Sequence, residues 1–173
     1  MTTPSWTRIQ LEKQADEKSD NGKTGLVKVD AKPPGCWTVI LPFVTGPRLL
    51  RFSVHDKDDK GAGVPMKWRL NSDEECGADG SIKGGTKTGA LVTSAALGAL
   101  VGKVGGSTAD LPDASTAAAT GGSGRKLFPV GSYAVVALTS NDSGPLFLTM
   151  NDGTEGFATH SGSLWVLIEE APL

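Results

Sequence analysis

The chain has 173 residues, a length typical of one domain, and 38% of them are hydrophobic, which excludes disorder over the whole length. Seventeen basic and 19 acidic residues give a net charge of −2 without a basic cluster, so no nucleic acid is expected as a partner. The most apolar stretch, residues 89–104, falls short of the ~20 residues that span a bilayer, and no signal-peptide pattern is visible. We therefore expect a protein without a membrane span that is cytoplasmic at synthesis; leaderless export or a cell-surface role stays open.

The N-terminal residues 1–24 form a charged extension. Apolar and polar residues alternate in 6–13 and again in 25–31, and the polar run between them ends in Asn-Gly. Because Asn-Gly is a strong hairpin-turn signal, this pattern predicts an N-terminal hairpin in which an outer strand over 6–13 pairs with 25–31. A short amphipathic helix over 8–18 is the alternative.

Alternation with a period of two residues continues through the rest of the chain, over 50–55, 146–150 and 164–168. Side chains on a strand point alternately to opposite faces, so each run offers one face to a core. Short strands separated by Gly, Pro and Asn turns predict an all-β fold, an antiparallel β-sandwich over residues 25–173. Residues 106–126, rich in Ser, Thr, Ala and Gly, are expected to form an inserted mobile loop or, alternatively, a partner-contacting arm.

Four segments in the C-terminal half follow one another in a familiar order: 97–104, 127–131, 144–153 (GPLFLTMNDG) and 160–164. In sequence and order they resemble the calcium-dependent galactophilic lectins of the LecA (PA-I) type, which occur as domains in many bacterial proteins. With weaker matches upstream, the resemblance covers about residues 26–170. It implies a jelly-roll-like sandwich, similar to galactose-binding domains, that commonly forms homo-oligomers.

In that family a calcium ion lies in the loop after the Asn-Asp pair, and sugar hydroxyls complete its coordination. The resemblance implies that Asp152 supplies the ligand carboxylate and Gly156 a backbone carbonyl. The family's two consecutive asparagines correspond to Thr159 and His160. Threonine still offers a hydroxyl, but imidazole nitrogen is a poor ligand for a hard cation. The calcium and sugar site is therefore degenerate in this sequence.

Glu155 lies in the same loop and could supply carboxylate oxygens in place of the calcium ligands that are lost at Thr159 and His160. The expected metal set is then Asp152, Glu155, Gly156 and Thr159. Alternatively, Asp152 only caps a tight turn together with Asn151, as Asx residues do.

The expected ligand-binding set includes the upstream positions Cys76 and Asp79, where the family places a histidine and a glutamine. Trp68 is the best candidate for stacking on a sugar ring, although a sandwich tryptophan often fills the core instead. Asn151 and His160 complete the set.

Catalysis is not expected. The chain has two histidines, His55 and His160, and the adjacent pair His160-Ser161 would point to opposite faces of a strand. Cys76 follows two glutamates, which disfavour its thiolate. Cys36 and Cys76 are read as buried thiols or one optional bridge.

Two functions remain. The first is a non-catalytic carbohydrate-binding module, with a galactoside-like ligand held by the loops 56–80 and 151–160, that acts through multivalent homo-oligomers. The alternative is a structural or adaptor protein that keeps the lectin-like fold, has lost sugar and calcium binding, and mediates protein–protein interaction. The strand 163–170 is the expected contact surface between subunits.

Overall fold

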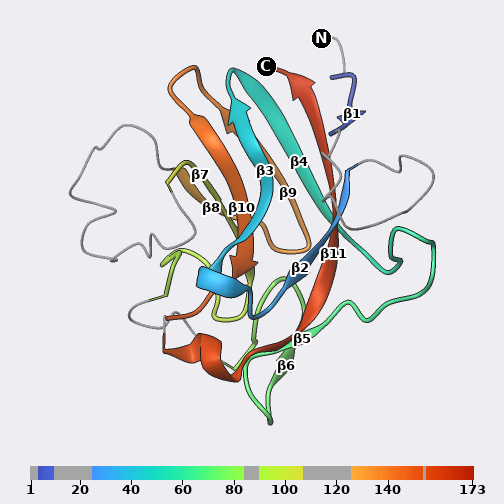
Figure 1. The fold of residues 1–173 in the computed structure, drawn as a ribbon, viewed down its shortest axis with the longest axis vertical. Coiled ribbons are helices and arrows are strands. Elements are labelled where there is room, and N and C mark those ends of the chain that lie inside the picture. Colours follow the sequence, from blue (N-terminus) through green and yellow to red (C-terminus); the bar gives the residue numbers. More distant parts are fainter. Residues whose placement is uncertain (1–3, 10–24, 84–89, 107–125, 154) are drawn as a thin grey trace.

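A computed structural model describes residues 4–9, 25–83, 90–106, 126–153 and 155–173 (Figure 1). Most of the expected extension 1–24 and of the expected inserted loop 106–126 lies outside the described residues. The described part consists of two antiparallel sheets and two short 3-10 helices, η1 (Pro34–Cys36) and η2 (Gly156–Thr159). The predicted all-β antiparallel sandwich is confirmed.

The larger sheet has seven strands. They are β1 (Thr7–Arg8), β2 (Leu26–Asp30), β4 (Arg48–His55), β5 (Trp68–Arg69), β6 (Glu75–Cys76), β9 (Tyr133–Leu138) and β11 (Ser161–Pro172). Strand β11 is central, since β4 pairs with one of its edges and β2 with the other. Both edges of the predicted contact strand 163–170 are thus used within the chain, which leaves only its faces for other contacts.

The smaller sheet has the strand order β3-β10-β7-β8. Its strands are β3 (Thr38–Thr45), β10 (Ser143–Met150), β7 (Leu100–Val104) and β8 (Lys126–Pro129). The main core lies between the sheets and includes Phe52, Leu148, Val166 and Ile168. A second cluster, with Trp37, Phe147 and Phe157, is covered by the 90–99 segment. No helix in the described part of the chain has the length and apolar character needed to cross a membrane.

The N-terminal segments do not have the expected pairing partner. Both β1 and β2 pair with β11, along the same edge of that strand. Ile168 marks the junction: its carbonyl accepts from the Ile9 N–H at 3.2 Å, and its N–H donates to the Gly25 carbonyl at 2.6 Å. Gly25 has φ +87°, and a Cβ there would lie 2.7 Å from the Ile168 oxygen. Alternation predicted the strands, but it carries no information on which strand each one joins.

The turn between β9 and β10 is held by Asp142. Its carboxylate accepts hydrogen bonds from the Thr139 N–H at 2.7 Å, the Thr139 hydroxyl at 2.9 Å and the Lys126 ammonium at 3.1 Å. Partial burial raises the pKa of this carboxyl, but the hydrogen bonds from Thr139 and Lys126 outweigh burial and hold the pKa below its usual value.

Candidate functional site

The loop predicted to hold the ion connects β10 to β11 and contains η2, at the end of the sandwich where β5 and β6 also lie (Figure 1). Its first residue, Asn151, is fully buried. The side-chain oxygen accepts from the Val92 N–H at 2.9 Å, and the amide donates to the carbonyls of Val92, Ala95 and Ala96 at 3.0–3.1 Å. Asn151 therefore anchors the 90–99 segment, and its amide is occupied inside the protein.

Asp152 is buried against its own loop. One carboxylate oxygen accepts from the N–H of the next residue, Gly153, at 2.6 Å. The other oxygen lies 3.0 Å from Nε2 of His160. A Cβ at position 156 would lie 1.9 Å from this same oxygen, so only glycine allows the backbone to cover the carboxylate.

His160 has no exposed side-chain surface, and each of its ring nitrogens faces an oxygen. Nδ1 lies 3.1 Å from the Ala31 carbonyl, and Nε2 faces Asp152. A carbonyl oxygen can only accept, so Nδ1 carries a proton. A bare Nε2 facing a carboxylate would be repelled, so one further proton lies between Nε2 and Asp152.

These side chains do not fit a calcium ion as they are arranged. Calcium takes six to eight oxygen ligands, whereas both oxygens of Asp152 are engaged by Gly153 and His160. The Thr159 hydroxyl is also used, with the carbonyls of Leu70 at 2.9 Å and Gly156 at 3.0 Å as its neighbours. Glu155 is exposed. Within the described ranges, no three His, Cys, Asp or Glu side chains come together in a group that could hold a metal.

Trp68 and Cys76, expected near a sugar, pair with each other across β5 and β6 and belong to the main core. The Trp68 ring is 1% exposed, and its Nε1–H donates to the Gly98 carbonyl at 2.8 Å. The structure therefore corrects the stacking role: Trp68 offers no ring face to a ligand. Burial, assisted by Glu74 and Glu75, raises the pKa of the Cys76 thiol to about 11.

Asp79 lies elsewhere, with an exposed side chain whose oxygen accepts from the Ser132 N–H at 2.7 Å. This contact holds the turn between β8 and β9. Of the expected site residues, the structure thus brings Gly156 and His160 together around the carboxylate of Asp152. Both cysteines, Cys36 and Cys76, are free thiols.

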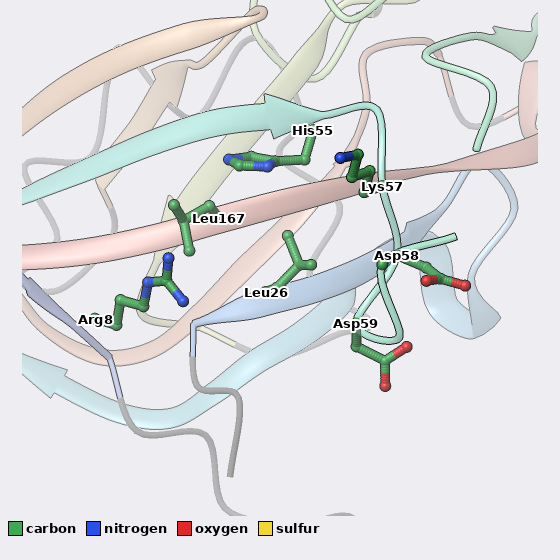
Figure 2. A pocket seen from close by; sticks show the side chains of 8 residues that line it. Arg8, Leu26, His55, Lys57, Asp58, Asp59 and Leu167 are labelled. Atoms are coloured by element: carbon green, nitrogen blue, oxygen red, sulfur yellow. The ribbon is translucent and has the colours of Figure 1, made fainter. Parts of the chain in front are cut away.

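Sequence reasoning missed a pocket of about 150 Å³ on the outer face of the larger sheet, walled by the loop after β4 (Figure 2). Its lining residues are Arg8, Leu26, His55, Lys57, Asp58, Asp59, Gly61 and Leu167. They come from four separate parts of the chain. The only local signal in the sequence is the run of charged residues in 56–60.

Comparisons with known proteins add one structural likeness. No family model matches the chain, and no curated protein matches it. Among solved structures, the chain is similar to one described as "EclA N-terminal domain; PllA-like lectin", with 16% sequence identity and a TM-score of 0.49. The match covers 85% of this chain and 94% of that one. The assignment of an all-β sandwich rests on the two sheets themselves.

Proposed function

We propose that the chain is a non-catalytic carbohydrate-binding module that works without calcium. The observation that carries the calcium-free part is the contact between His160 and Asp152 at 3.0 Å. In the lectins that the sequence resembles, a divalent cation neutralises the equivalent carboxylate. Here a shared proton and an imidazole neutralise it, and Nδ1 ties the loop to the carbonyl of Ala31, the residue that follows β2.

The engagement of His160 and Cys76 within the protein supports a non-catalytic role. His160 uses both ring nitrogens in internal contacts, so it has no free nitrogen to act as a general base. The raised pKa of Cys76 keeps its buried sulfur a thiol at neutral pH, and the thiolate is the nucleophilic form.

Thermal unfolding with millimolar calcium and with a chelator tests the calcium-free part. A ligand at about 100 times its Kd stabilises the native state by about 2.7 kcal/mol, which is a rise in Tm of about 5–10 °C for a chain of this size. We expect the same Tm in both buffers. A calcium-dependent rise of that size would contradict the proposal.

The double variant Thr159→Asn/His160→Asn is the matched comparison, because it restores the asparagine pair of the resembled lectins. It removes the imidazole and offers two amide oxygens to an ion. If His160 is what replaces calcium, only this variant should gain a calcium-dependent rise in Tm.

Carbohydrate binding itself is tested by screening a panel of neutral and acidic glycans in the presence of a chelator. Binding of at least one saccharide class under these conditions is the expected result. A folded chain that binds no saccharide would contradict the proposed function and favour the structural alternative.

One observation favours assembly as a second candidate function. Strand β3 has a ladder partner on one side only within the described residues, and it exposes Val39 at 47% and Phe43 at 64%. An edge strand with exposed apolar side chains is a surface at which another chain can add, although Pro42 limits direct strand pairing. Sedimentation of wild type and Phe43→Ser tests this: an oligomer that dissociates in the variant supports assembly through β3, and a wild-type monomer contradicts it.

A further inference from the structure

The pocket on the larger sheet has an apolar floor built from neighbouring strands. Leu167 of β11 lies directly opposite Leu26 of β2 in the strand register, and opposite Ser53 of β4 on its other edge. Residues directly opposite one another on adjacent strands share a face of the sheet. Leu26 and Leu167 therefore form the floor, with His55 at one side and Arg8 at the other (Figure 2).

Three nitrogen-bearing side chains surround this floor. Figure 2 shows the guanidinium of Arg8 and the ammonium of Lys57 directed toward the His55 side of the pocket. None of the three makes a side-chain hydrogen bond or ion pair with any residue in the described segments. A few polar side chains around an apolar floor are the arrangement expected of a ligand site.

The carboxylates near the pocket do not neutralise these groups. Asp58 accepts from the N–H groups of Lys60 and Ala62 at 2.9 and 2.8 Å, and both Asp58 and Asp59 are turned away from the floor in Figure 2. Glu169, opposite Arg8 in the register, is held by Arg51 at 2.7 Å from Nε and 2.6 Å from Nη2. Among the described residues, the charged groups directed into the pocket are the cations of Arg8 and Lys57.

The wall of the pocket is fixed by hydrogen bonds within its own loop. The Val64 N–H donates to the Asp56 carbonyl at 2.8 Å, and the Asp58 N–H donates to the Ala62 carbonyl at 2.9 Å. Lys57 pairs with Gly63 in an isolated bridge. A wall that is already ordered loses little conformational freedom when a ligand binds.

The volume of the pocket and the side chains that line it indicate which class of ligand it would bind. A volume of 150 Å³ is about that of the engineered cavity that holds one benzene ring, so one six-membered ring fits. The planar fork of Arg8 matches a carboxylate, which it can bind with two parallel hydrogen bonds. The apolar floor matches the C–H face of a sugar ring, and His55 and Lys57 can reach hydroxyl oxygens.

We propose that this pocket binds one acidic monosaccharide unit, a hexuronate, with its carboxylate on Arg8 and its ring over Leu26 and Leu167. The inference rests on the proposed carbohydrate-binding function and names the ligand class. It places the ligand away from the loop that contains Asp152. A neutral sugar would leave Arg8 without an anionic partner, and a small inorganic anion would leave the floor uncovered.

The test is a titration of the full chain with D-galacturonate, in chelator, followed by amide chemical shifts. Galactose is the matched ligand, because it differs only in carrying a hydroxymethyl group in place of the carboxylate. We expect galacturonate to bind at least about tenfold more tightly than galactose, since a hydrogen bond to a charged group contributes about that factor. Shifts should concentrate around Arg8, His55 and Lys57.

Variants separate the pocket from the rest of the surface. Arg8→Gln and Lys57→Gln each remove one cation from the pocket, and Arg8→Gln should weaken galacturonate binding by about tenfold or more. Arg69→Gln is the matched control, because Arg69 is exposed on β5 and outside the pocket. It should leave binding unchanged.

Four results would overturn the inference: no binding of galacturonate, binding that Arg8→Gln leaves unchanged, equal binding of galactose, or equally tight binding of inorganic phosphate at the same residues. A chain that binds neutral glycans in the panel but not galacturonate would overturn this pocket alone. A chain that binds no saccharide at all would overturn the proposed function as well.

Discussion

The substitution His160→Ala tests how much the imidazole contributes to the loop. It removes the imidazole that contacts Asp152, whose side chain is 6% exposed, and it removes the bond to the Ala31 carbonyl. Breaking a buried pair by deleting one member costs about 3–5 kcal/mol, because the carboxylate that remains loses its contact with the imidazole while it stays buried. For a chain of this size that is a fall in Tm of about 6–20 °C.

Asp152→Asn should cost much less. The amide oxygen of asparagine can still accept from the Gly153 N–H, and its NH₂ can donate to Nε2 of a neutral His160. With these contacts kept, we expect a loss of about 1 kcal/mol. The contrast between the two variants therefore measures how much the loop depends on the imidazole compared with the charge of Asp152.

The assay is urea unfolding at neutral pH in chelator, with equal m-values as the check that the unfolded state is unchanged. Glu155→Gln, an exposed change in the same loop, is the control and should shift the free energy of unfolding by no more than about 0.5 kcal/mol. A cost for His160→Ala below about 1 kcal/mol, or equal costs for His160→Ala and Asp152→Asn, would refute the reasoning.

Three further predictions follow from single contacts. Asp142→Asn should lower the free energy of unfolding by about 1 kcal/mol at neutral pH. Because the pKa of this carboxyl is depressed in the folded state, the difference should fade as the pH drops through that pKa; urea titrations in which it stays constant in acid would contradict this. Cys76, with a pKa of about 11, should be labelled by a thiol reagent only on unfolding, and peptide mapping that finds it labelled in the native state would contradict its burial. Gly61→Ala should cost about 1–2 kcal/mol through its positive φ alone, whereas Gly25→Ala should cost more because its Cβ also meets a backbone oxygen; equal thermal shifts would refute that contact.

The sequence predicted those parts of the fold that alternation encodes. Residues 50–55, 146–150 and 164–168 lie in β4, β10 and β11, where every second side chain enters the main core. Their periodicity is a local property, since one face of each strand must be apolar if it packs on the other sheet. The partner of β1 and β2 could not be read in the same way, because pairing is set by which edge of β11 is open.

Less of the candidate site than of the fold could be predicted from the sequence. Trp68 lies in a two-residue strand between irregular segments, so no period indicated which way its ring points. The sequence placed His160 in the expected loop but gave no sign that its imidazole contacts Asp152. The pocket could not be predicted from the sequence, because Arg8, Leu26 and Leu167 are brought together only by the pairing of β1 and β2 with β11.

In the loop between β10 and β11, we propose that the His160 imidazole and one proton neutralise the Asp152 carboxylate in place of a calcium ion. The most direct measurement is the ¹⁵N chemical shifts of the His160 ring during a calcium titration. The account predicts a protonated Nδ1, a hydrogen-bonded Nε2, and shifts that calcium leaves unchanged. Calcium-dependent movement of both ring nitrogens, with Nε2 released from Asp152, would contradict it.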